Sequence, residues 1–331
     1  MRPLFCIFSG LLIVCLGSAF GQGPTLTGAG YPNPTPIRVT PGQIITVFLS
    51  NTKTVSYQRA TSIPLPTSLA GFSVTIRDYT GTHPAPLLAV GQTPLCRINT
   101  SPDCLMTALQ IQIPFELTWT RDPPTDVVLI VNDNGTQSEP FLLAPTLDII
   151  HVLTTCETQG GMLSNGVVPA FPPCSGVVTH ADGSLVSSNS PAKAGEVVVI
   201  YAQGMGSTTP AVKTGSATPI PAPVLGGPPP LGARTVDVQF DFRPNATPSH
   251  PYLNPLIAAP FVPGPLFVGL TPGQVGLYQI NVKIPDTLPP IPACTGYSSS
   301  TLLGYVQSNL TIDIGGVTSF DGAAICVQPG Q

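Results

Sequence analysis

Proline and glycine interrupt this chain so often that long helices are excluded. The 331 residues include 41 prolines and 33 glycines. Proline breaks helix interiors because it lacks a backbone N–H, and glycine lowers helix stability. Between these residues lie short runs of β-branched and aromatic side chains, such as Ile44-Ile45-Thr46-Val47-Phe48. Short strands separated by turn residues predict an all-β protein of the sandwich or barrel type.

Each expected strand is a period-2 or β-branched run bounded by glycine, proline, asparagine or aspartate. These runs cover residues 43–49, 72–78, 86–90, 108–113, 126–131, 147–153, 177–180, 196–202, 235–241, 266–270, 277–284, 309–314 and 323–328. No stretch carries apolar residues at helical spacing over three turns. We therefore expect almost no helix.

The order of these elements repeats once along the chain. Gly42 and Gly195 each open a β-branched run, Ile113-Pro114 and Ile284-Pro285 each end one, and Asn134-Gly135 and Gly315-Gly316 each follow one. A repeat of more than 150 residues indicates a duplicated domain and not a solenoid unit, which has a period of roughly 20–50 residues. We expect two tandem β-sandwich domains, at residues 24–150 and 151–331.

The first 21 residues have the layout of a secretory signal peptide. Arg2 precedes an uncharged apolar run from Leu4 to Leu16, and small residues follow at Gly17, Ser18, Ala19 and Gly21. The run is shorter than the roughly 20 residues that span a bilayer, and prolines interrupt the most apolar later stretch. We expect an exported protein, secreted or at the cell surface, without a transmembrane segment in the mature chain.

Charge is scarce in this sequence. Charged residues make up 8% of the chain, the net charge is −4, and the 12 basic residues are scattered singly. This distribution argues against nucleic acid or an anionic membrane as a partner. Hydrophobic residues make up 42% of the chain, which is the opposite of the composition of disordered proteins.

Six cysteines remain after the predicted signal peptide. They are Cys96, Cys104, Cys156, Cys174, Cys294 and Cys326. An even number in an exported chain indicates three disulfides, for which 15 pairings are possible. The sequential pairing Cys96–Cys104, Cys156–Cys174 and Cys294–Cys326 is the simplest. No Cys-x-x-Cys pair exists and the histidines complete no ligand set, so we expect no metal site.

A search for catalytic chemistry finds one weak candidate. His180 lies near Asp182 and Ser184, but no Gly-x-Ser-x-Gly elbow accompanies them. On one short turn such residues more often form local Asx-turn contacts than a catalytic triad. Gly204-x-Gly206 is not followed by the helix that a phosphate site requires, so a turn is the better interpretation. We expect no catalytic residues and no cofactor.

Aromatic side chains give a second functional hypothesis. Sandwich domains bind sugars through exposed flat rings, and Trp119, Tyr252 and Phe261, with His250, are tentative binding-surface candidates. For Trp119 the alternative is packing in the core or at an edge. For the other three it is a proline-stiffened loop.

The second half carries a series of separate turn signals in a fixed order. These are Asp182-Gly183-Ser184-Leu185, Pro191-Ala192, Gly195, Val199, Tyr201, Gly204, Gly206, Gly269, Pro272-Gly273, Val275-Gly276-Leu277, Gln279-Ile280-Asn281 and Ile284-Pro285. Residues 177–331 thereby resemble the acidobacterial family known as the Solibacter uncharacterised C-terminal domain, and the first half resembles its upstream portion more loosely. The resemblance implies exported Ig-like or TIG-like β-domains without an established activity. Residues 242–265 and the cysteines depart from the pattern.

These observations favour an exported, non-catalytic structural, adhesion or binding module. A carbohydrate-binding module and an extracellular hydrolase with an unrecognised site are the alternatives. The partner is unknown, and an extracellular polysaccharide or a surface protein is the expected class.

Overall fold

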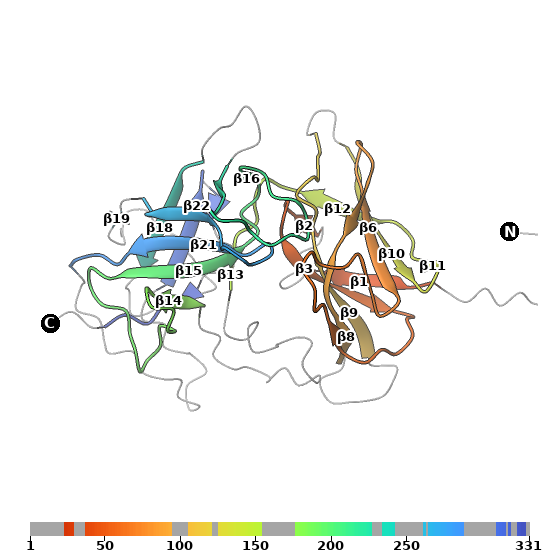
Figure 1. The fold of residues 1–331 in the computed structure, drawn as a ribbon, viewed down its shortest axis with the longest axis horizontal. Helices are drawn as coiled ribbons and strands as arrows, with labels where there is room; N and C mark the ends of the chain where they lie inside the picture. The colour runs from red at the N-terminus through yellow and green to blue at the C-terminus, as the bar shows by residue number, and fades with distance from the viewer. Residues whose placement is uncertain are drawn as a thin grey trace, which may run out of the picture.

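The computed structural model describes eleven segments of the chain. They are residues 23–29, 37–94, 105–120, 125–153, 176–226, 234–241, 261–262, 264–287, 309–315, 317–318 and 323–328. Within these segments every regular element is a β-strand, which confirms the all-β prediction (Figure 1). None of the described residues belongs to a helix long and apolar enough to cross a membrane. The predicted signal peptide lies outside the described residues.

The first half of the chain forms two sheets. One has the strand order β1 (Thr25–Ala29), β3 (Ile44–Ser50), β9 (Leu105–Gln112), β8 (Leu87–Pro94) and β4 (Gln58–Arg59). The other has the order β2 (Arg38–Val39), β12 (Phe141–Pro145), β10 (Val127–Asp133), β6 (Phe72–Arg77) and β5 (Ser68–Leu69). In this second sheet β11 (Thr136–Gln137) pairs with β10, and β7 (Thr82–Ala85) pairs with β6.

The second half also forms two sheets. One has the order β13 (His151–Val152), β15 (Val197–Gln203), β21 (Tyr278–Lys283), β20 (Phe267–Leu270), β17 (Val224–Leu225) and β16 (Thr208–Thr209), and β14 (Val178–His180) pairs with β15. The other has the order β19 (Phe261–Val262), β18 (Val236–Asp241), β22 (Asn309–Ile314) and β23 (Val317–Thr318), and β24 (Ala323–Ala324) pairs with β22.

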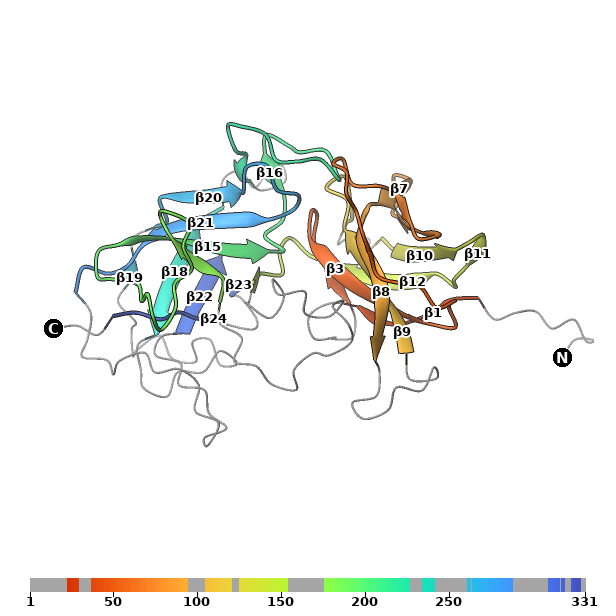
Figure 2. The ribbon, with the colours of Figure 1, turned by 60° about the horizontal axis from the view of Figure 1, so that its bottom comes forward.

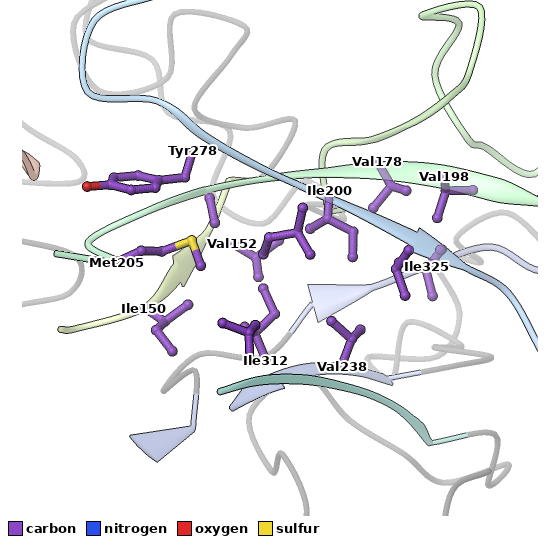
Figure 3. Packing of buried hydrophobic residues seen from close by; sticks show 14 of the residues in the cluster. Ile150, Val152, Val178, Val198, Ile200, Met205, Val238, Tyr278, Ile312 and Ile325 are labelled. Atoms are coloured by element: carbon purple, nitrogen blue, oxygen red, sulfur yellow. The ribbon is translucent and has the colours of Figure 1, made fainter. Parts of the chain in front are cut away.

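Each half has its own hydrophobic cluster between its two sheets. In β6 the buried residues alternate with partly exposed ones, so Phe72, Val74 and Ile76 point into the first cluster. Strands β3, β8 and β9 supply the opposite side of that cluster. The second cluster is built in the same way, and Figure 3 shows Tyr278 and Met205 at one end of it. The packing of two sheets around one cluster is consistent with β-sandwich domains.

The same turn hydrogen bonds recur in both halves. The Gly42 amide donates to the carbonyl of Ile113 at 3.0 Å, and the Gly195 amide donates to that of Ile284 at 3.1 Å. The Asn134 amide donates to Gly71 at 3.0 Å, as the Gly315 amide does to Thr235 at 3.1 Å. The repeated turn signals in the sequence therefore correspond to repeated contacts in the structure.

A parallel contact also recurs. Strand β12 pairs with β2 in parallel, with Pro145 opposite Val39. In the second half an isolated parallel bridge joins Ala192 and Val327. Val39 and Ala192 each precede the corresponding turn glycine by three residues. A parallel contact at this position is thus present in both halves.

Some strand predictions were wrong in extent. Of the expected strand 147–153 only His151–Val152 is a strand, because residues 146–150 connect the two halves. Among the described strands of four or more residues, β1, β7 and β12 were missed, and most of the two-residue strands were missed as well. The sequence of β7 contains Pro84, and that of β1 is short and contains glycine, so neither has the pattern of a central strand. The expected hairpin turn at Asn134-Gly135 is confirmed between β10 and β11.

Candidate functional site

His180 lies at the end of β14 and contacts two residues that the sequence search did not single out. Its Nδ1 contacts the carboxylate of Glu196. Its Nε2 lies 3.1 Å from the hydroxyl oxygen of Ser190 and 3.1 Å from the carbonyl oxygen of the same residue. Glu196 immediately precedes β15, the partner strand of β14, so the hairpin pairing brings the acid to the imidazole.

The order serine, histidine, carboxylate is that of a nucleophilic triad, but Nε2 of His180 faces a backbone carbonyl as well as the serine hydroxyl. A general base must present an unprotonated Nε2 to the serine hydroxyl. Here Nε2 also faces a backbone carbonyl, which only accepts, while Nδ1 faces a carboxylate, which also only accepts when ionised. The doubly protonated imidazolium satisfies both contacts. His180 is therefore built as a clamp between β14 and the 187–196 loop.

The electrostatics of this cluster agree with its geometry. The hydrogen bond that His180 donates to Glu196 raises the pKa of His180 and outweighs the effect of partial burial, which lowers it. Burial opposes ionisation of Glu196, but the hydrogen bond with His180 prevails and the pKa of the Glu196 carboxyl is lowered. Lys193 adds a backbone N–H bond to Glu196 at 2.8 Å. Both pKa shifts favour the charged form of the pair, with His180 protonated and Glu196 ionised.

Asp182 and Ser184 form a separate local turn. Asp182 Oδ1 accepts the amide of Ser184 at 2.9 Å and its hydroxyl at 2.7 Å, which is the Asx-turn arrangement. The hydrogen bonds of the His180 imidazole go instead to Glu196 and Ser190. The candidate cluster of the sequence search is therefore replaced by His180, Glu196 and Ser190. A spacing of 16 residues between histidine and glutamate gives no local signal, since only strand pairing joins them.

Asp78 is the most heavily bonded carboxylate of the first half. It follows β6 and its side chain is fully buried. Its Oδ1 accepts the amide and hydroxyl of Thr80, at 2.8 and 2.7 Å, and the amide of Gly81 at 3.1 Å. Its Oδ2 accepts the amide and hydroxyl of Thr118, at 2.9 and 3.0 Å, and lies 3.2 Å from Nε2 of His83.

This arrangement stabilises charge on a buried group. Burial alone would raise the pKa of Asp78, but the hydrogen bonds from Thr80 and Thr118 outweigh it and hold the pKa well below its usual range. Thr118 lies beyond the end of β9, in a segment that leaves the other sheet of this half. Asp78 therefore connects the two sheets. A carboxylate whose two oxygens are occupied by protein donors is a structural anchor.

The tentative binding-surface residues give no exposed aromatic patch among the described side chains. Trp119 is partly buried and packs against the first hydrophobic cluster, as the alternative interpretation expected. Phe261 lies in β19, where its backbone alone is described, and His250 and Tyr252 lie outside the described residues. A sugar-binding role stays a prediction.

Of the six cysteines only Cys326 lies within the described residues, and it is disulfide-bonded. It lies beside the second cluster, and its carbonyl accepts the amide of Ala192 at 3.0 Å. The pairing pattern proposed from the sequence stays a prediction. No group of three or more histidine, cysteine or acidic side chains that could hold a metal occurs in the described part of the chain.

The two motif glycines Gly204 and Gly206 serve the connection between the halves. A Cβ on Gly204 would overlap the carbonyl oxygen of Ile149, and one on Gly206 would overlap that of Leu147. The Ile149 amide donates to Gly204 at 2.7 Å. No helix follows these glycines, since the next element is β16. Close approach of the linker, residues 146–150, explains why glycine is needed here.

The linker also carries a buried ion pair. Asp148 contacts Arg234, and only 2% and 10% of their side chains are exposed. Burial raises the pKa of Asp148, and the contact with Arg234 offsets this only in part. Arg234 also donates to the carbonyl of Met205 at 3.3 Å. Tyr278, whose pKa burial raises, donates its hydroxyl to the carbonyl of Gly206.

No protein-family model matches the chain, and no curated protein is detectably similar to it. The geometry of the molecule is therefore the basis for any functional assignment.

Proposed function

We propose that the chain is an exported, non-catalytic structural or adhesion module built of two tandem Ig-like or TIG-like β-sandwich domains. One observation carries this proposal: the charged side chains packed into the described fold hold turns and loops together. Both oxygens of Asp78 accept protein donors, both nitrogens of His180 face acceptors, and Asp148 is paired with Arg234. None of these groups presents a free base, acid or nucleophile in the way that catalysis requires.

The recurrence of turn contacts supports the tandem arrangement. Equivalent hydrogen bonds at Gly42 and Gly195, and at Asn134 and Gly315, are what a duplicated domain would retain. The resemblance to exported β-domains and the signal-peptide layout of residues 1–21 support export to the cell surface or beyond.

A hydrolase and polysaccharide panel tests this proposal. The full chain and the His180→Ala variant are assayed in parallel for hydrolysis of ester, peptide and glycoside substrates. We expect the same background rate from both proteins. A turnover that disappears in His180→Ala would show that Ser190, His180 and Glu196 form a working triad, and would overturn the proposal.

The same panel separates adhesion from pure scaffolding. Retention of the chain on an insoluble polysaccharide, reduced in a Tyr252→Ala or Trp119→Ala variant, would show a binding module. No retention on any polysaccharide would favour a structural role or a protein partner.

A further inference from the structure

A loop of the second half crosses to the first half and bonds to it at four points. We call residues 212–218, which follow β16, the strap (Figure 2). The Gly215 amide donates to Oε1 of Gln112 at 2.7 Å, and its carbonyl accepts the Leu65 amide at 2.8 Å. The Thr214 hydroxyl accepts the Phe115 amide at 2.7 Å and donates to the carboxylate of Glu116.

The strap is itself held by a second loop of its own half. Thr218 donates its amide to the carbonyl of Gln274 at 2.9 Å and accepts the amide of Gly273, also at 2.9 Å. This links the strap to the turn at residues 271–277, which leads into β21. Both loops are therefore bonded to each other within the second half.

The turn at residues 271–277 touches the first half directly at Gly276. A Cβ on Gly276 would lie 2.7 Å from the carbonyl oxygen of Gly42, 3.0 Å from Nε2 of Gln112 and 3.3 Å from a side-chain carbon of Ile44. Backbone therefore meets backbone across the junction. No side chain larger than that of glycine fits without moving the two halves apart.

The Gln112 contacts of the junction are buried, whereas the Thr214–Glu116 bond is exposed. Gln112 is fully buried, and its amide group spans the junction, since Oε1 accepts from Gly215 and Nε2 lies 3.5 Å from the Gly42 carbonyl. Phe115 of the first half packs against the hydrophobic cluster of the second. Separating the halves would return these polar groups to water and would expose the part of the Phe115 ring that the second cluster covers, so the stabilisation from burying that ring would be lost.

The linker is fixed from both sides as well. Thr40 of the first half donates its hydroxyl to the carbonyl of Leu147 at 2.9 Å. The second half holds the same segment through Gly204 and through Arg234. The connection between the halves therefore has no free turn about which they could rotate.

From these contacts we infer that the two halves form a single rigid body, whose relative orientation is set by the strap and by the close approach of Gly276 to Gly42. Two domains in one chain move relative to each other unless their interface is large and well packed. Here a strap, a backbone-to-backbone contact and a fixed linker join the two halves at three places. The motif residues Gly204, Gly206 and Gly276 all lie at this junction, so part of the second-half motif specifies the orientation of the domains.

Residual dipolar couplings measured on the full chain test this inference. Backbone couplings from the first half and from the second are fitted separately to an alignment tensor. A rigid body gives the same tensor for both halves. Two tensors of different magnitude or orientation in the unmodified chain would overturn the inference.

A matched pair of glycine variants then tests the role of Gly276. Gly276 and Gly273 lie in the same turn with φ of 62° and 74°, but a Cβ on Gly273 meets nothing within 4 Å. Both substitutions by alanine therefore carry similar backbone strain. We expect Gly273→Ala to keep the common tensor and Gly276→Ala to lose it. A common tensor in both variants would show that the contact does not set the orientation.

A strap variant covers the case in which Gly276→Ala does not fold. Thr214→Val combined with Glu116→Gln removes the hydroxyl bonds of the strap without adding bulk. We expect the two tensors to diverge in this variant as well, while the couplings within each half still fit its own structure. If both halves of this variant still fit one tensor, the strap does not set the orientation of the halves. The proposed function stands apart from this test, because a hydrolytic activity would overturn the function without changing the tensors.

Discussion

Pro114 and Pro285 follow corresponding strands in the two halves, but the residues after them differ in kind. Phe115 follows the first proline, covers Gly42 and packs against the second hydrophobic cluster. Asp286 follows the second, and its side chain is 74% exposed beside Lys283. The same turn therefore lies at the junction in the first half and at the solvent-exposed surface in the second. The two halves share the turn, and its position in the molecule determines the kind of side chain that follows the proline.

Two Asx turns give a second comparison. Asp78 bonds to the amide and hydroxyl of Thr80, and Asp182 bonds in the same way to Ser184, with distances that agree within about 0.1 Å. Only Asp78 also reaches a distant segment, at Thr118. The local motif is the same in both halves. The long-range contact is what makes one of them an anchor.

The largest expected effect concerns the linker. Asp148→Ala leaves the Arg234 guanidinium buried without its carboxylate, and such losses cost about 3–5 kcal/mol. The control is Asp286→Asn at the exposed pair with Lys283, where we expect a change within about 0.5 kcal/mol. Urea unfolding followed by tryptophan fluorescence and circular dichroism measures both. Equal effects of the two substitutions would contradict the assigned difference in burial.

The second largest expected loss of stability is that of Asp78→Asn. The new amide nitrogen cannot accept the Thr118 amide and hydroxyl, so we expect a loss of about 3 kcal/mol in the free energy of unfolding. Asp182→Asn retains an oxygen for the local turn and lies at the surface, so we expect no measurable change. If both variants unfold at the same urea concentration as the unmodified chain, the Thr118 contact does not anchor the two sheets.

We expect Phe115→Ala to lower the free energy of unfolding by less than Asp78→Asn does, and to change the number of unfolding transitions. The side chain is only partly buried, so we expect a loss of about 2 kcal/mol, together with separation of the unfolding of the two halves into two transitions. Phe141→Ala is the control, because Phe141 is also partly buried but packs against the first cluster alone. Differential scanning calorimetry distinguishes them. One shared transition in Phe115→Ala would argue against a role of this ring in coupling the halves.

The smallest expected effect is the response to pH. The pKa of His180 is raised in the folded chain, so its stabilising contribution is complete below the ordinary histidine pKa of about 6.5 and is lost as pH rises through the folded value. The pKa of Asp78 is lowered, so its contribution is complete above about pH 4 and is lost on acidification. The contribution of the His180 clamp therefore falls as pH rises, and the contribution of the Asp78 anchor falls as pH is lowered.

Unfolding curves collected from pH 3 to pH 9 measure these contributions. His180→Gln cannot be protonated, so we expect it to abolish the decline above pH 6.5 and to leave the Asp78 contribution at acid pH. Asp78→Asn weakens the decline at acid pH only in part, because the Glu196 carboxyl, whose pKa is also lowered, contributes there too. An alkaline decline that persists in His180→Gln would contradict the clamp assignment.

The sequence predicted the features that depend on neighbouring residues. The run Phe72-Ser73-Val74-Thr75-Ile76 alternates in the way that a half-buried strand requires, and β6 has that burial pattern. The turn at Asn134-Gly135 follows from the tolerance of these two residues for positive φ. Strand β7 escaped prediction, since Pro84 argued against it and only the pairing with β6 makes it a strand.

Local pattern thus determined the all-β class, most strand positions and the repeated turns, because alternation and turn chemistry act over a few residues. Tertiary structure alone decided that Glu196 meets His180, that Thr118 meets Asp78 and that Gly215 meets Gln112. These pairs are separated by 16, 40 and 103 residues. Which of them meet depends on strand order and on the path of loops across the junction. The same local pattern is compatible with other long-range contacts, because a hydrogen bond between distant segments produces no periodic pattern in the sequence.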